Sequence, residues 1–286
     1  MKKFLKKFFW LLEENLGLGN IRRELKFDAE LSRDDYLRKY LYDNEKYANA
    51  KKLNKFEYNV YSQGGEDGLL AEIFKRTGTT NKFFVEFGIG NGLQNNTLFL
   101  LLNGWQGCWI DGAEKAVKSI KETHKFVIGK KLEVKNSFIT AENIESLFAL
   151  LAIPKEPDFL SIDIDGNDYW VWRAISKYQP RVVVIEYNGL FPPDLKWVMK
   201  YNPQNKWNRT SYYGASLKSL ELLGREKGYK LVGCNFAGEN AFFVREDLVG
   251  DKFHEPFTAE NHYETKKLFL LRESGDRRSF GEFENI

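Results

Sequence analysis

Short apolar runs alternate with stretches of helical periodicity from residue 82 to residue 245, and this alternation constrains the fold more than any other feature. Near-continuous apolar runs are typical of strands that are covered on both faces, as in a parallel sheet. Helices between such strands provide the two covering layers. We therefore predict an α/β fold with a doubly wound, mostly parallel, seven-stranded sheet. Strands are expected at 82–88, 107–111, 132–136, 158–163, 181–187, 229–236 and 240–245.

The connections between these strands differ in kind. A short turn around Gly238 joins the last two strands, which predicts a terminal hairpin and therefore one antiparallel strand. The segment 189–213 is long and rich in Pro, Asn and aromatic residues, so we interpret it as a lid over an active site. Its aromatic side chains either stack on a sugar ring or pack the lid. Helices are expected at 66–77, 94–103, 113–123, 141–152, 168–177 and 215–228.

Two further segments flank the alternating region. Residues 1–57 are charged and lack a strand signal, so we expect a helical N-terminal appendage, and 246–286 form a C-terminal extension. Within residues 1–16, apolar side chains recur at helical spacing among lysines. Such a basic amphipathic helix either makes peripheral contact with an anionic membrane or packs on the core or on a second subunit of a homo-oligomer.

Charge and hydropathy exclude several classes of protein. The formal net charge of +3 is too small to indicate a nucleic-acid partner. No run of about 18 apolar residues is present, so we expect no membrane-spanning helix. Lys6 and Lys7 interrupt the first apolar stretch, which argues against a cleaved signal peptide. Cys108 and Cys234 are expected to be buried and reduced. We therefore expect a cytoplasmic protein. If residues 1–16 contact a membrane instead of packing on protein, the contact is expected at its inner face.

The stretch VEFGIGNG, residues 85–92, ends the first expected strand in a glycine-rich turn. Glycines there let the backbone approach a ligand closely, at the switch point where open parallel sheets bind ligands. Leu93 stands where the dinucleotide fingerprint has its third glycine. Glu86 would repel a pyrophosphate but suits a positively charged ligand. S-adenosylmethionine carries an ammonium and a sulfonium and no phosphate, so these residues favour it over NAD.

The stretch WIDG, residues 109–112, ends the next strand in an acid. Asp111 either accepts hydrogen bonds from ribose hydroxyls or is a turn residue before Gly112. Two acids at successive strand ends, together with a glycine turn, indicate a cofactor site more specifically than either acid does alone.

Seven segments of the chain form a combined pattern. They are YSQGGEDGLLAEIF (61–74), FFVEFGIGNGLQNNTLFL (83–100), GWQGCWIDG (104–112), SFITAENI (137–144), FLSIDIDGNDYWVW (159–172), VVVIEYN (182–188) and YYGASLKSL (212–220). Together they resemble the FkbM-like, S-adenosylmethionine-dependent methyltransferases. The resemblance covers 58–245 and implies a methyltransferase domain that transfers a methyl group to a hydroxyl of a sugar, a polysaccharide or a hydroxylated metabolite. An NAD-dependent oxidoreductase and a non-catalytic cofactor-binding scaffold are the alternatives.

The resemblance also implies a set of cofactor contacts. The glycine turn binds the methionine and adenosine parts, the acid after the second strand binds the ribose, and polar residues after the third strand lie near the adenine. Ser62 and Gln63 either reach the cofactor or cap the first helix. The implied cofactor-binding residues are Ser62, Gln63, Glu86, Gly88, Gly90, Asn91, Asp111, Gly112, Asn136, Ser137 and Asp163.

Three aspartates follow one apolar run in FLSIDIDGNDYW, residues 159–170. Asp163 is expected at the carboxyl end of the fourth strand, facing the cofactor's methyl group. Asp165 is either a turn residue or a metal ligand. Asp168 is expected to cap the following helix by accepting backbone N–H bonds.

Glu186 and Asn188 end the neighbouring strand, so their oxygens are expected beside those of Asp163 and Asp165. Carboxylate and amide oxygens at two adjacent strand ends form a hard site that suits Mg²⁺ or Mn²⁺. Metal-dependent O-methyltransferases of catechols and macrolide sugars are similar in this respect. These four residues are the predicted metal ligands.

The identity of the general base stays open between several groups. A metal would lower the pKa of a substrate hydroxyl and orient its oxygen. Without a metal, Asp163 would deprotonate the substrate directly. His254 and His262, from the C-terminal region, are further candidates. The predicted catalytic residues are Asp163, Asp165, His254 and His262.

Overall fold

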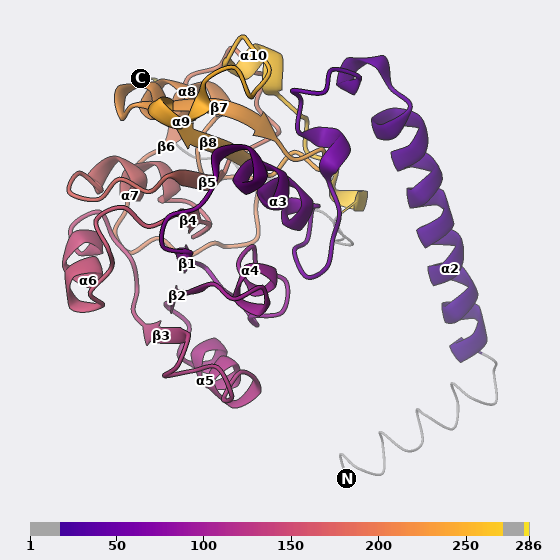
Figure 1. Ribbon diagram of the computed structural model, residues 1–286. Helices are drawn as coiled ribbons and strands as arrows, with labels where there is room; N and C mark the ends of the chain where they lie inside the picture. Colours follow the sequence, from indigo (N-terminus) through magenta and orange to yellow (C-terminus); the bar gives the residue numbers. More distant parts are fainter. Residues whose placement is uncertain (1–17, 271–282, 286) are drawn as a thin grey trace. The chain divides into compact units, whose positions relative to one another are not determined.

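The computed structural model describes residues 18–270 and 283–285, which belong to two compact units, Met1–Ala48 and Asn49–Ile286 (Figure 1). The first unit is helical in its described part, and it ends at Ala48 instead of at the expected boundary of 57. The predicted amphipathic segment 1–16 lies outside the described residues. The helices of this unit are α2 (Leu18–Leu37), the π-helix η1 (Arg38–Tyr42) and the 3₁₀-helix η2 (Glu45–Tyr47).

The second unit contains a seven-stranded sheet in the order β3-β2-β1-β4-β5-β8-β7. All neighbours run parallel except β8, which is antiparallel to both β5 and β7. The predicted fold class is therefore confirmed, and the arrangement is that of a Rossmann-like, doubly wound sheet. The strands are β1 (Phe83–Phe87), β2 (Gln106–Asp111), β3 (Leu132–Asn136), β4 (Phe159–Ile162), β5 (Val182–Glu186), β7 (Tyr229–Cys234) and β8 (Asn240–Arg245).

Helices cover both faces of this sheet because successive strand side chains point to opposite sides. Val85 and Phe87 pack with α6, α7 and α8, whereas Phe84 and Trp109 pack with α3, α4 and α5 (Figure 1). Both cysteines are buried, and neither forms a disulfide. The helices are η3 (Asn54–Phe56), α3 (Glu66–Thr77), α4 (Leu98–Leu102), α5 (Glu114–Thr123), α6 (Ile144–Leu150), α7 (Asp168–Ala174) and α8 (Leu217–Glu226).

The part of the C-terminal extension from 246 to 270 packs within the second unit. The backbone N–H of Lys266 donates to Gly189 O (3.1 Å), and that of Lys267 donates to Ala237 O (2.7 Å). A Cβ on Gly189 would lie 2.3 Å from the carbonyl oxygen of Gly238, so only glycine permits this close approach. The remaining elements are β6 (Trp197–Met199), α9 (Glu246–Val249), α10 (Ala259–His262), η4 (Leu268–Leu270) and β9 (Phe283–Asn285), which pairs with β6.

The order of the strands fixes where a ligand crevice forms. From β1 the chain proceeds to β2 and β3 on one side, and then to β4 and β5 on the other. The carboxyl ends of β1 and β4 therefore diverge into helices on opposite faces, which opens a crevice at that edge. Within residues 18–270 and 283–285, no helix is both long and apolar enough to cross a membrane.

Candidate functional site

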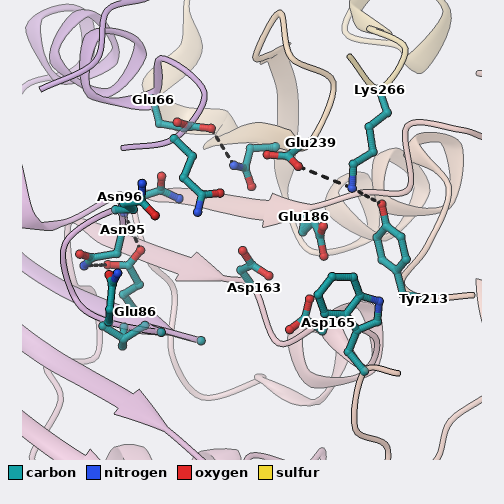
Figure 2. Close-up of a pocket in the computed structure, with 18 residues that line it drawn as sticks. Glu66, Glu86, Asn95, Asn96, Asp163, Asp165, Glu186, Tyr213, Glu239 and Lys266 are labelled. Atoms are coloured by element: carbon teal, nitrogen blue, oxygen red, sulfur yellow. Dashed lines mark hydrogen bonds and ion pairs between the residues drawn. The ribbon is translucent and has the colours of Figure 1, made fainter. Parts of the chain in front are cut away.

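Two cavities adjoin at the carboxyl ends of the parallel strands. One, of about 290 Å³, is lined by many acids and is called the acidic cavity here (Figure 2). The other, of about 460 Å³, lies over the ends of β1 and β2 and is called the Asp111 cavity. They share one boundary, so a single elongated ligand can occupy both. The residues that line both cavities are Gly88, Gly90, Asp163, Asp165 and Trp207.

The glycine turn after β1 presents bare backbone to both cavities. Gly88 has φ +71°, and a Cβ at this position would lie 1.5 Å from the carbonyl oxygen of Asp163. Gly90 has φ +58°, and a Cβ there would meet nothing within 4 Å. The first glycine thus lets β1 and β4 end side by side, and the second leaves open space beside the backbone.

Glu86 anchors the loop that follows the glycine turn. Its carboxylate accepts hydrogen bonds from Asn95 Nδ2 (2.7 Å), from Asn96 N (2.8 Å) and from the backbone and hydroxyl of Thr97. These bonds hold 95–97 outside a helix, so α4 begins at Leu98 and the predicted helix 94–103 is shorter than expected. Burial raises the pKa of Glu86, although these hydrogen bonds oppose the rise. Glu86 also lines the acidic cavity, as does Asn91.

Asp111 connects the ends of β1 and β2. Its Oδ2 accepts from Gly90 N (3.0 Å) and its Oδ1 from Ala113 N (2.7 Å). Gly112 and Ser137 line the Asp111 cavity beside it, as the sequence predicts. Phe138, which no sequence pattern singled out, lines it too and is 40% exposed.

Asn136 does not reach this cavity, which corrects its predicted contact with the adenine. Its side chain is exposed, and its Nδ2 donates to the backbone carbonyl of Asp111 (2.9 Å). The amide therefore positions Asp111 instead of touching a ligand.

The structure separates the two alternatives for Ser62 and Gln63. Ser62 is buried and its Oγ accepts from Asp67 N (3.0 Å), while Asp67 Oδ2 accepts from Ser62 N (2.9 Å). Ser62 therefore stabilises the first turn of α3 and lies outside both cavities, which corrects its predicted contact with the cofactor. Gln63 lines the acidic cavity.

The carboxylates of Asp163, Asp165 and Glu186 lie together in the acidic cavity and are called the acid group here. One oxygen each of Asp163, Asp165 and Glu186 lies within 4.8 Å of the others. Glu186 is buried, and among the described residues its Oε2 is one of the few buried side-chain atoms without a hydrogen-bond partner. Burial, followed by mutual repulsion, raises the pKa values of Asp163 and Glu186 well above the usual range. Close, buried carboxylates of this kind are stabilised by a cation.

Asp165 and Asp168 have different roles in the turn after β4. Asp165 has φ +56°, a left-handed conformation that aspartate tolerates, so it is both a turn residue and a member of the acid group. Asp168 Oδ1 accepts from Ile164 N and Oδ2 from Gly166 N, both at 2.8 Å. Asp168 therefore closes the turn behind it and does not cap α7 in the predicted manner. Burial raises its pKa to about 6.

Asn188 does not lie with the three carboxylates, beside which the sequence analysis expected it. It is fully buried and lines neither cavity. Its Nδ2 donates to the carbonyl oxygens of Ser211 and Tyr213, both at 3.1 Å, and its Oδ1 accepts from Leu190 N (3.2 Å). The amide therefore joins the two ends of 189–213.

The two C-terminal histidines do not lie in the cavities, where the sequence analysis expected a base. His254 and His262 line neither cavity, and their rings lie 6.4 Å from each other beside Asn261. Burial, followed by repulsion from Lys52 and Lys51, lowers the pKa of His254. A different residue of the same extension, Lys266, lines the acidic cavity.

Lys266 is the functional residue that sequence reasoning missed. Its Nζ donates to the hydroxyl of Tyr213 (2.8 Å) and forms an ion pair with Glu239 Oε1 (3.5 Å) (Figure 2). Among the described residues that line the acidic cavity, it is the one basic side chain, against six carboxylates. Burial alone would lower its pKa, but Glu186, Tyr213 and Glu239 raise it. Its positive charge in turn opposes the rise in the pKa values of Glu186 and Asp163, which remain above the usual range.

Comparisons of the sequence with known proteins gave no relative. A scan against protein-family models found no match, and a search of curated proteins found none that is similar.

Solved structures share the general layout of the chain at low similarity. The N-terminal domain of EvdMO1 with SAH bound has 15% identity and a TM-score of 0.40, over 65% of this chain and 81% of that one. A putative sarcosine dimethylglycine methyltransferase from Galdieria sulphuraria has 17% and 0.38, over 57% and 60%. The magnesium protoporphyrin IX methyltransferase from Synechocystis PCC 6803 with bound SAM has 11% and 0.41, over 63% and 77%. These values bear on neither the activity nor the substrate of this chain.

Proposed function

We propose that the protein is an S-adenosylmethionine-dependent O-methyltransferase, which acts on a hydroxyl of a sugar, a polysaccharide or a hydroxylated metabolite with the help of a divalent cation. One observation carries the proposal. Three carboxylates lie together beside the glycine turn. Asp163 and Asp165 line both cavities, and Glu186, whose buried Oε2 has no hydrogen-bond partner, lines the acidic cavity. The proposal agrees with the FkbM-like resemblance of the sequence.

The residues around the glycine turn fit the cofactor. Gly88 and Gly90 leave backbone open at the boundary, and Asp111 offers carboxylate oxygens to ribose hydroxyls in the larger cavity. Gln63 lines the other end, where an amino-acid moiety would lie. When bound there, S-adenosylmethionine supplies a methyl group on a sulfonium, which is an electrophile.

The acid group fits a hard divalent cation. Asp163, Asp165 and Glu186 each offer one oxygen, which leaves coordination positions for a substrate hydroxyl and water. Mg²⁺ or Mn²⁺ bound there would lower the pKa of that hydroxyl. If no metal takes part, the carboxylate of Asp163 is the group on this strand end that accepts the proton.

Tyr213 is placed to hold the acceptor. Because Lys266 donates to the Tyr213 oxygen, the phenolic proton is free to point elsewhere, including toward an acceptor oxygen in the cavity. Burial, followed by the nearby Glu186 carboxylate, raises the pKa of Tyr213, so it keeps this proton. Tyr213 therefore acts as a donor and not as the base.

The charge of the acidic cavity restricts the acceptor. Its lining has six acidic side chains against one lysine, which disfavours an anionic ligand. An acceptor that carries a phosphate group is repelled, whereas an uncharged polyhydroxyl compound is not. The carboxylate of the cofactor differs from such a group because the adjacent ammonium offsets its charge. The same repulsion disfavours the pyrophosphate of NAD, and with it the alternative that the protein is an oxidoreductase.

Calorimetry on the full chain tests the proposal. We expect S-adenosylhomocysteine to bind, NAD not to bind, and Mn²⁺ to bind in a manner that EDTA reverses. Glu186→Gln should weaken Mn²⁺ binding at least about tenfold, because it removes one charged ligand. The exposed Glu133→Gln is the matched control and should bind Mn²⁺ like the unmodified protein.

Binding of NAD instead of S-adenosylhomocysteine would contradict the methyltransferase. Unchanged Mn²⁺ binding in Glu186→Gln would remove the metal from the proposal. If both ligands bind but no methyl transfer occurs to neutral glycosides, the protein is a cofactor-binding scaffold.

A further inference from the structure

One aromatic side chain lies where the two cavities meet. Trp207 belongs to the segment 189–213, lines both cavities and is 36% exposed. Its indole Nε1 donates to Thr210 O (3.0 Å), which fixes the ring within its own loop. Two residues earlier, Asn205 Nδ2 donates to the backbone oxygen of Asp165 (3.3 Å), so the loop is held against the acid group.

The boundary between the cavities has a specific chemistry. It consists of glycine backbone, two carboxylates and one indole. This inference rests on the proposed function, in which the nucleoside of the cofactor occupies the Asp111 cavity and its amino-acid end occupies the acidic cavity. The sulfur joins those two ends, so it belongs at the boundary, beside Trp207.

We propose that Trp207 binds the sulfonium of S-adenosylmethionine through a cation–π contact and so distinguishes the charged cofactor from its neutral product. The face of an indole is the strongest aromatic partner for a cation. After methyl transfer the sulfur is an uncharged thioether, which loses this attraction and leaves more readily.

A second tryptophan of the same segment provides the matched control. Trp197 has a similar exposure of 37%, but it lines neither cavity, and its ring lies 5.5 Å from that of Phe191. A general effect of removing a lid tryptophan would therefore appear in both variants, whereas an effect of charge would appear only at Trp207.

Two ligands of the same shape but different charge test the proposal by calorimetry. S-adenosylhomocysteine is neutral at sulfur, and sinefungin carries a primary ammonium in place of the methylsulfonium. We define the charge preference as the Kd of S-adenosylhomocysteine divided by that of sinefungin. Trp207→Leu should lower this preference about fivefold, as expected for loss of a cation–π contact. Trp207→Phe should lower it less, and Trp197→Leu should leave it unchanged.

The outcomes separate this inference from the function on which it rests. Suppose that the unmodified protein binds both ligands, and that Trp207→Leu weakens the binding of both equally or of neither. The indole then only packs the lid, and the inference is wrong while the proposed function is unaffected. If the unmodified protein binds neither ligand, the proposed function is wrong and the inference with it. A lower charge preference confined to the Trp207 variants supports the inference.

Discussion

The Asp111 cavity and the acidic cavity adjoin, yet they are built from different parts of the chain. Most of the Asp111 cavity comes from turns that directly follow β1, β2, β3 and β4. The acidic cavity takes side chains from the start of α3, from β5, from the β7–β8 turn and from the C-terminal extension. The first is shaped by backbone geometry at strand ends, and the second by a balance of charges that distant segments bring together.

This contrast predicts different responses to substitution. Changes at the shared boundary or in the Asp111 cavity should act on cofactor binding. Changes at Lys266 should act on the electrostatics of the acidic cavity and leave cofactor binding nearly intact.

The largest effect is expected for Gly88→Ala, at the boundary itself. The added Cβ would lie 1.5 Å from the carbonyl oxygen of Asp163, so the ends of β1 and β4 must separate. We expect S-adenosylhomocysteine binding to weaken at least about 100-fold and the free energy of unfolding to fall by about 3 kcal/mol. Calorimetry and urea unfolding measure the two quantities.

Gly78→Ala is the control for that substitution. Gly78 has φ +72° at the end of α3, but a Cβ there would meet nothing within 4 Å, so only backbone strain of about 1 kcal/mol is expected. Its ligand binding should match that of the unmodified protein. Equal binding by Gly88→Ala would contradict the close approach of the two strands as the basis of the site.

An intermediate effect is expected for Asp111→Asn. The change removes the charge that accepts hydrogen bonds in the larger cavity, and a charge-assisted hydrogen bond contributes about 1.5–3 kcal/mol. S-adenosylhomocysteine should therefore bind about tenfold or more weakly, as measured by calorimetry. The exposed Glu114→Gln, three residues along, should have no effect. If Asp111→Asn binds normally, the ribose lies elsewhere.

The smallest effect on cofactor binding is expected for Lys266→Met. S-adenosylhomocysteine should bind within about twofold of normal, while the free energy of unfolding falls by about 3 kcal/mol because buried carboxylates lose their cation. Mn²⁺ should restore part of that stability by supplying the missing positive charge. Thermal unfolding with and without Mn²⁺ measures this rescue.

Lys267→Met separates this effect from the loss of any buried lysine. Lys267 is buried and paired with Glu264 (3.0 Å), but it lines neither cavity. It should lose stability without a comparable rescue by Mn²⁺. Equal rescue in both variants would mean that Lys266 does not balance the acid group.

The sequence determined the sheet, the glycine turn and the positions of Asp111, Asp163 and Glu186. These are predictable because apolar runs mark the strands, and because parallel strands place their carboxyl ends along one edge. A residue that directly follows such a run is therefore located without knowledge of any side-chain contact.

Only the tertiary structure decided which of the remaining polar groups reach the site. The amide of Asn188 is bound by the carbonyl oxygens of Ser211 and Tyr213, and the two histidines lie away from both cavities. Lys266 enters the acidic cavity because its backbone is held by Gly189, far away in the sequence. Such contacts depend on how loops pack against each other, and no local periodicity records that packing.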